Sequence, residues 1–180
     1  MVKRTSTRFI ARMIEGAKPS EMPGFIPPQL ATLKLRAPAG DKWIHEIKFD
    51  GYRIQVHLYK GKVKIFTRNG HDWANRFHLL AESFDSQSSG PSSMARSSSL
   101  RMAAPTSQNS GCTRQRPTEE HGVLAFDPLF LEGFDLRKSP QIERKRVLKM
   151  LFDETRLASP IVYSAIFSLT ATRCMRTPAS

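Results

Sequence analysis

Cysteine, acidic residues and long apolar runs are all scarce in this 180-residue chain. Its two cysteines, Cys112 and Cys174, show no C-x-x-C spacing, which argues against a disulfide framework or a zinc site and favours a reducing, cytoplasmic location. No apolar run approaches the roughly 20 residues of a membrane-spanning helix, so no membrane partner is expected. The five histidines show no metal-ligand spacing, and we therefore predict no metal site made by protein side chains.

Basic residues outnumber acidic ones by 28 to 16, which gives a net charge of +12. Such an excess favours a polyanionic partner such as nucleic acid. Half of the excess comes from two stretches, residues 86–118 and 165–180, which contain arginine but no acid. The rest of the chain is therefore only moderately basic.

Apolar periodicity predicts an α+β fold. Strands are expected at 43–48, 53–59, 63–67 and 123–134, and helices at 73–84 and 141–152. Turns are expected at 60–62 and at Asn69-Gly70. The basic residues at 144–149 in the second helix are expected to form a solvated face rather than a DNA contact.

Composition divides the chain into three parts. Residues 1–24 are interpreted as an N-terminal arm, with the fold beginning near Phe25 and continuing to 164. Within it, residues 86–118 include ten serines and lose apolar periodicity, which is typical of a disordered insert. Periodicity fades again in an aberrant tail at 165–180.

One short motif carries recognisable chemistry. Residues 48–53 read Lys-x-Asp-Gly-x-Arg, where Gly51 permits the tight backbone that brings a lysine close to a phosphate. A lysine nucleophile must be at least partly unprotonated, so nearby positive charge, a metal or desolvation has to favour the neutral amine. Lys48 could also be an ordinary solvated lysine, since so short a motif occurs by chance.

Several further segments resemble the ligase domain of ATP-dependent DNA ligases of the bacterial end-joining type. These segments are residues 25–33, 43–53, 67–73, 124–137 and 142–146. The resemblance spans about 25–85 and 121–157. It implies part of an α+β nucleotidyltransferase (adenylation) domain with antiparallel sheets.

The resemblance also implies roles for individual residues. Lys48 would accept AMP and release pyrophosphate. Glu46 would contact the adenine, and Phe126 would stack near the nucleotide. Taken without the resemblance, Glu46 is also explained as a surface acid and Phe126 as a core residue.

The remaining implied positions concern the sugar and the phosphates. Arg53 and Arg68 would bind ribose, phosphate or the 5′-phosphate of a nick, because a guanidinium donates in a fork. Asp50 would orient the lysine and the sugar. The implied cofactors are ATP and Mg²⁺, and the implied partner is nicked or broken DNA in repair and recombination, with end-joining factors as further candidates. Both arginines could equally be ordinary surface charges.

The family's Asp-Gly-Glu motif has no counterpart between the predicted helix at 73–84 and the strand at 123–134. We interpret residues 86–118 as a frameshifted reading of it. GC-rich codons for residues 93–102, read from the third base of the first codon, give Asp-Gly-Glu-Val-Val-Val-Ala-Ala-Asp. The tail can be recoded in the same shifted frame, and the gene sequence would test both readings. A genuine disordered insert is the alternative.

The chain also stops short of the family's downstream lysines and OB-fold domain, so we expect a truncated ligase with impaired sealing activity.

Two other functions stay open at this point. One alternative is a non-catalytic remnant that binds nucleotide or DNA. The other is an RNA-capping guanylyltransferase, which shares the lysine motif, although residues 68–72 favour a ligase.

Overall fold

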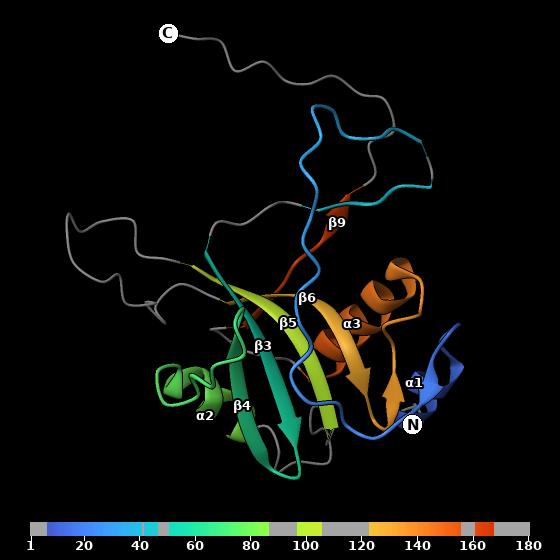
Figure 1. The fold of residues 1–180 in the computed structure, drawn as a ribbon. Coiled ribbons are helices and arrows are strands. Elements are labelled where there is room, and N and C mark those ends of the chain that lie inside the picture. The colour runs from blue at the N-terminus through green and yellow to red at the C-terminus, as the bar shows by residue number, and fades with distance from the viewer. Residues whose placement is uncertain are drawn as a thin grey trace, which may run out of the picture.

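The computed structural model describes residues 7–40, 42–46, 51–86, 97–105, 123–155 and 161–167. Figure 1 shows a twisted sheet with helices packed beside it. The sheet follows the order β1-β7-β6-β5-β3-β4, with β8 also paired to β6. The sheet strands are Lys18–Pro19 (β1), Gly51–Tyr59 (β3), Lys62–Thr67 (β4), Ser97–Pro105 (β5), Val123–Leu131 (β6), Phe134–Asp135 (β7) and Ile161–Tyr163 (β8).

Antiparallel pairing dominates, which confirms the predicted α+β class. Only the β6–β8 pair among the described ladders is parallel. A separate two-stranded ladder joins His45–Glu46 (β2) to Ile166–Phe167 (β9). The helices are Thr7–Met13 (α1), His78–Ser86 (α2) and Gln141–Thr155 (α3). No helix in the described part of the chain is long and apolar enough to cross a membrane.

The sheet has two different faces because side chains alternate along each strand. Ile54, Val56 and Leu58 of β3 are buried on the face that α2 and α3 cover. Phe77, Leu80 and Phe84 meet them from around α2, as the periodicity predicted. The helix itself begins at His78 rather than at residue 73, because 74–77 form a turn.

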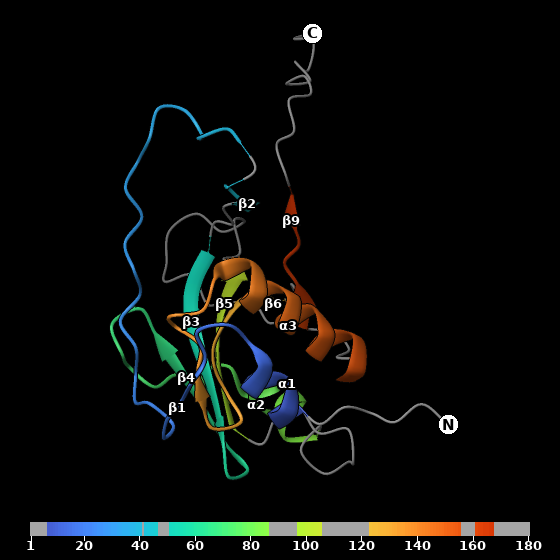
Figure 2. The same ribbon diagram turned by 90° about the vertical axis from the view of Figure 1, so that its right-hand side faces the viewer.

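The opposite face of the sheet is crossed by residues 25–31, which we call the strap (Figure 2). The strap is fastened at three places. The backbone N–H of Ile26 donates to Gln55 Oε1 at 3.2 Å, and Arg101 donates to the carbonyl of Pro27 at 3.3 Å. The Phe25 ring lies 5.7 Å from that of Phe66.

The expectation that 86–118 would be disordered throughout is wrong for Ser97–Pro105. These residues form β5 in the interior of the sheet, paired with β3 along its whole length and with β6 on the other side. Leu100 and Met102 are fully buried and supply the apolar contacts that hold the strand. Serine content concealed a strand because tertiary burial overrides weak local propensity. The other residues of 86–118, apart from Ser86 in α2, lie outside the described part.

The fold also begins earlier than residue 25. Ala11 and Ile14 are buried against Leu136, Val147 and Leu151, so α1 packs on α3. β1 then pairs with β7, with Lys18 opposite Asp135. The segment from residue 7 to 19 is therefore part of the folded domain rather than a separate arm. Within the expected aberrant tail at 165–180, Ile166–Phe167 form β9 and pair with β2, and residues 168–180 lie outside the described residues.

Candidate functional site

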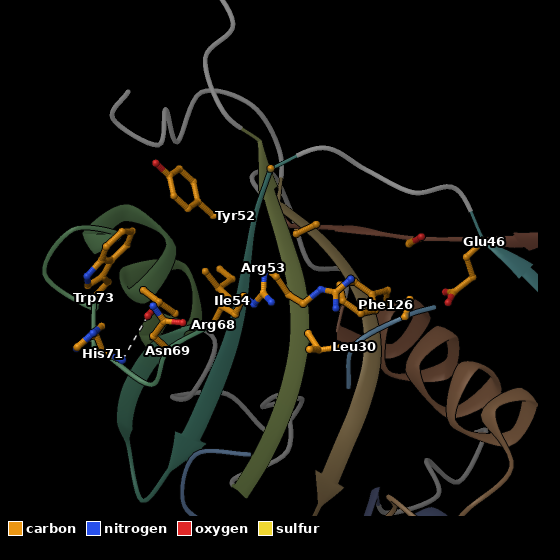
Figure 3. A pocket seen from close by; sticks show the side chains of 15 residues that line it. Leu30, Glu46, Tyr52, Arg53, Ile54, Arg68, Asn69, His71, Trp73 and Phe126 are labelled. Atoms are coloured by element: carbon orange, nitrogen blue, oxygen red, sulfur yellow. Dashed lines mark hydrogen bonds between the residues drawn. The ribbon is translucent and has the colours of Figure 1, made fainter. Parts of the chain in front are cut away.

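A cavity of about 1150 Å³ opens where the strap passes the ends of β3, β5 and β6 (Figure 3). Each of these elements contributes to its wall, together with β2 and the loop that follows β4. The lining residues are Leu30, Ala31, Glu46, Gly51, Tyr52, Arg53, Ile54, Thr67, Arg68, Asn69, His71, Trp73, Ala103, Phe126 and Ser164. Segments that are more than 100 residues apart in sequence therefore meet around one space.

Two arginines give the cavity a positive side. Arg53 extends from β3 and Arg68 follows β4, and both are exposed (Figure 3). Exposed guanidiniums in a concave site attract anions and bind phosphate in a bidentate manner. Glu46 is the one carboxylate among the described lining residues, so their charge balance favours an anionic ligand.

Phe126 reaches the cavity through an irregularity in β6. Arg101 of β5 is opposite Asp127 while Met102 is opposite Ala125, so Phe126 is the extra residue of a bulge. Bulges commonly redirect a side chain beside a functional site. The Phe126 ring belongs to neither buried cluster of the described core. The Arg53 Cζ atom lies 6.0 Å from its centroid, so a cation and an aromatic face meet at the cavity wall.

A second aromatic group lines the other side. Tyr52 and Trp73 approach edge to face with centroids 5.7 Å apart, and the Arg76 guanidinium lies 4.5 Å from the Trp73 centroid. Asp72 holds this loop, since its Oδ1 accepts from the backbone N–H groups of Ile65 and Ala74. The loop after β4 is therefore fixed against the sheet.

Glu46 is bound by α3. Lys145 forms an ion pair with its Oε1, and the Gln141 side chain donates to its Oε2 at 3.0 Å. Lys145 also donates to the Ser164 carbonyl at 3.2 Å. The basic residues of α3 were expected to face solvent, and for Lys145 and Arg144 that expectation is wrong, because both turn inward to carboxylates.

Arg144 belongs to a buried network next to Phe126. Its Nε donates to Asp127 Oδ1 at 2.8 Å, and Arg101 lies 3.8 Å from Asp127 Oδ2. Burial raises the pKa of Asp127, while Arg144 and Arg101 oppose that rise. The network ties α3, β5 and β6 together directly behind the bulge that presents Phe126.

Four of the six residues singled out from the sequence line this cavity: Glu46, Arg53, Arg68 and Phe126. Lys48 and Asp50 lie outside the described residues, although Glu46 and Gly51, which border that gap, are both in the lining. Sequence reasoning missed the strap residues Leu30 and Ala31. It also missed Lys145, whose signal was a basic residue among the core positions of an amphipathic helix.

The next question is whether the described side chains of the cavity could hold a metal ion. No group of three or more His, Cys, Asp or Glu residues is close enough within the described ranges to hold an ion. Glu46, the one carboxylate of the described lining, has its Oε1 buried in an ion pair with Lys145 and its Oε2 hydrogen-bonded to Gln141. The described residues alone therefore do not fit a Mg²⁺ site.

Comparison with known proteins matches the same region of the sequence. Residues 29–94 match the family model of the ATP dependent DNA ligase domain. The chain is 41% identical over 70 residues to the multifunctional non-homologous end joining protein LigD of Pseudomonas aeruginosa, a match that covers 39% of this chain and 8% of that protein. It is 33% identical over 131 residues to DNA ligase 6 of Arabidopsis thaliana, covering 62% and 9%.

More distant matches extend further along the chain. A DNA ligase of Thermoplasma volcanium is 28% identical over 149 residues, covering 72% of this chain and 25% of that protein. The ligase domain of Mycobacterium tuberculosis LigD has a TM-score of 0.48 at 25% identity, covering 69% of this chain and 39% of that one. A mycobacterial DNA ligase D complexed with ATP and MES has a TM-score of 0.46 at 22% identity, covering 68% and 39%.

The three curated relatives are much longer proteins, of which this chain spans between 8% and 25%. Both TM-scores lie below 0.5, so the assignment rests on the sequence matches. Those matches include the Lys-x-Asp-Gly-x-Arg motif and the loop that carries Arg68. Residues 29–94 are therefore similar in sequence to the ATP dependent DNA ligase domain, and a 70-residue stretch of the chain is similar to a bacterial end-joining ligase.

Proposed function

We propose that this chain binds ATP in the cavity and forms a lysyl-AMP intermediate at Lys48, the first step of DNA nick sealing. The observation that carries the proposal is the meeting of Glu46, Arg53, Arg68 and Phe126 around one cavity. Their chemistry is complementary to a nucleotide, which has an apolar base face, an amine on the base edge and an anionic phosphate chain.

Each part of ATP has a suitable partner. The Phe126 ring, which lines the cavity, suits stacking of the adenine ring. Glu46 accepts a hydrogen bond from the exocyclic amine of adenine. Arg53 and Arg68 stabilise the phosphates, where negative charge gathers during the displacement.

In the reaction itself, the Lys48 amine attacks the α-phosphorus of ATP. A nitrogen–phosphorus bond forms, the bond to the pyrophosphate oxygen breaks, and the amine proton passes to solvent. Positive charge from the two arginines favours the neutral amine and also the leaving pyrophosphate. Asp50 would orient the lysine and the ribose.

Mg²⁺ is proposed to enter together with the triphosphate rather than to occupy a preformed site, since the lining offers no free carboxylate among the described residues. An ion carried by the phosphates would neutralise part of their charge.

The proposed nucleic-acid substrate is nicked or broken duplex DNA, to whose 5′-phosphate AMP would move before the 3′-hydroxyl displaces it. The basic charge balance supports such a partner. We propose that sealing by this chain alone is impaired, because residues 87–122 contain no Asp-Gly-Glu motif. End-joining factors remain proposed partners.

Labelling with ATP tests the first step. We expect purified protein incubated with Mg²⁺ and α-phosphate-labelled ATP to gain covalent label, and Lys48→Ala to lose it. Lys62→Ala removes an exposed lysine of β4 and serves as the matched control, which should label normally. Labelling by GTP instead of ATP would identify a guanylyltransferase.

The absence of Asp-Gly-Glu specifically favours a second candidate, a remnant that binds nucleotide without reacting. Reversible ATP binding without covalent label would support the remnant. If the protein showed no ATP binding and no covalent label, both candidates would be overturned.

A further inference from the structure

Lys145 is the most deeply buried cation in the described part of the chain. Its exposed fraction is 1%, and it occupies an α3 position beside the core residues Val147 and Leu148. Burying an ammonium costs several kcal/mol unless it is paired and hydrogen-bonded. An apolar residue would satisfy the packing of this position, so the charge itself requires an explanation.

Its partners all lie at the cavity. Lys145 pairs with Glu46 and donates to the Ser164 carbonyl, and both Glu46 and Ser164 are lining residues. The ammonium also lies 5.9 Å from the centroid of Tyr163, next to Ser164. Lys145 itself is not in the lining, so it acts on the cavity through Glu46.

Gln141 completes the arrangement one helical turn earlier. Residues spaced by four lie on the same face of a helix, so Gln141 and Lys145 point to the same carboxylate. Gln141 donates to Oε2, while Lys145 forms an ion pair with Oε1, which is buried; Oε2 is therefore the oxygen that keeps a lone pair for a ligand. Glu46 is thereby held as an acceptor at the edge of the cavity nearest α3 (Figure 3).

We propose that Lys145 is a positioning residue that gives the cavity its preference for adenine over guanine nucleotides. This inference rests on the proposed function, in which Glu46 contacts the base. A carboxylate fixed by the ion pair with Lys145 and the hydrogen bond from Gln141 accepts from the amine of adenine and repels the carbonyl oxygen that guanine has at the same place. Without Lys145 the carboxylate can turn away, and the two bases become similar in affinity.

Equilibrium binding of ATP and of GTP by the full chain tests this, independently of covalent labelling. We expect the wild type to prefer ATP. Lys145→Met should weaken ATP binding by about tenfold, because Glu46 loses the ion pair that fixes it, and should leave GTP binding unchanged. Lys145→Arg should keep most of the preference.

Lys149→Met is the matched control, because Lys149 is an exposed lysine of the same helix that pairs only with Asp153 among the described contacts. It should leave both affinities unchanged. Gln141→Leu changes an exposed residue and removes only the second donor to Glu46, so it tests the idea even if Lys145→Met does not fold. It should lower the ATP-to-GTP ratio in the same direction, by less.

The outcomes separate the two proposals. Folded Lys145→Met or Gln141→Leu protein with the wild-type ATP-to-GTP ratio would overturn the positioning role while the nucleotide site stands. A wild type that binds neither nucleotide would overturn the proposed function, and this inference with it. A loss of ATP binding in Lys149→Met as large as in Lys145→Met would show a general effect of helix charge and would also overturn the inference.

Discussion

Gln55 donates from its side-chain Nε2 to the Nε2 of His57, 2.6 Å away on the same face of β3. The same amide donates to Ser99 Oγ at 2.9 Å, and its oxygen accepts from the backbone of Ile26. One side chain thus joins β3, β5 and the strap. Because the His57 ring must act as an acceptor, it has to be neutral. Burial, assisted by Lys64, lowers the pKa of His57 to about 4, against a smaller opposing effect of Asp72.

This pairing predicts a loss of stability in acid. Unfolded His57 takes up a proton near its ordinary pKa of 6.5, whereas folded His57 resists protonation down to about 4. The unfolded state therefore binds more protons, so this contribution is complete above pH 6.5 and is lost as the pH falls toward 4. We expect a loss of about 2–3 kcal/mol at pH 4.5 relative to pH 7, measured by urea unfolding.

His57→Gln removes the titrating ring and should flatten this part of the profile, leaving the dependence that is due to the other titrating groups. Equal losses in the wild type and in His57→Gln would contradict the assignment to His57.

Adjacent serines of β5 offer a paired test of burial. Ser98 lies opposite Leu58 and Leu131, and its buried hydroxyl has no hydrogen-bond partner among the described residues. Ser98→Val should raise the free energy of unfolding by about 1 kcal/mol, since it removes an unpaired polar group and adds buried apolar surface.

Ser99→Val is the matched control on the other face. It removes the acceptor of Gln55 and should lower the free energy of unfolding by about 1 kcal/mol. Both changes add the same β-branched side chain, so chemical denaturation of the two variants isolates the hydroxyl. A fall of equal size in both would refute the assigned faces.

Alanine substitutions at two glycines in turns separate the cost of backbone strain from the cost of a clash with the strap. Gly70 has φ +82°, and a Cβ there would lie 3.0 Å from Phe25 Cδ1. Gly61 has φ +73° with no atom within 4 Å of the same position. Alanine at either site pays the cost of positive φ, but Gly70→Ala must also displace Phe25. We expect it to be less stable than Gly61→Ala by about 1 kcal/mol in denaturant unfolding.

Gly70→Ala should also bind ATP more weakly than Gly61→Ala, because Phe25 belongs to the strap that carries Leu30 and Ala31 to the cavity. If Gly61→Ala lost more free energy of unfolding than Gly70→Ala, the close approach of residue 70 to Phe25 would not contribute to stability.

The carboxylate between Arg101 and Arg144 should matter far more than an exposed one. Asp127→Ala leaves two largely buried guanidiniums without their shared partner, and we expect a loss of about 3 kcal/mol in the free energy of unfolding. Asp153→Ala breaks the exposed pair with Lys149 on α3 and should lower the free energy of unfolding far less, because solvent screens a surface pair. Thermal and urea unfolding of both variants measure the difference, and similar losses would contradict the importance given to burial.

Local patterning predicted much of the framework because it depends on neighbours in sequence. The alternation at Ile54, Val56 and Leu58 located β3, and the apolar spacing after Gln141 located α3. β5 was hidden because three serines have low strand propensity, and only pairing with β3 and β6 stabilises an extended conformation there. The inward turn of Arg144 and Lys145 was hidden for a similar reason, since their carboxylate partners are distant in sequence.

The sequence by itself determined the lysine motif, the similarity of residues 29–94 to an ATP dependent DNA ligase domain and the candidate residues Glu46, Arg53, Arg68 and Phe126. Short motifs survive in sequence because their chemistry requires fixed residue types at fixed spacing. The tertiary structure alone decided that these four line one cavity, that a bulge turns Phe126 into it and that Lys145 holds Glu46. Such relations join residues up to about a hundred positions apart, and they arise only when the sheet pairs and α3 packs against it.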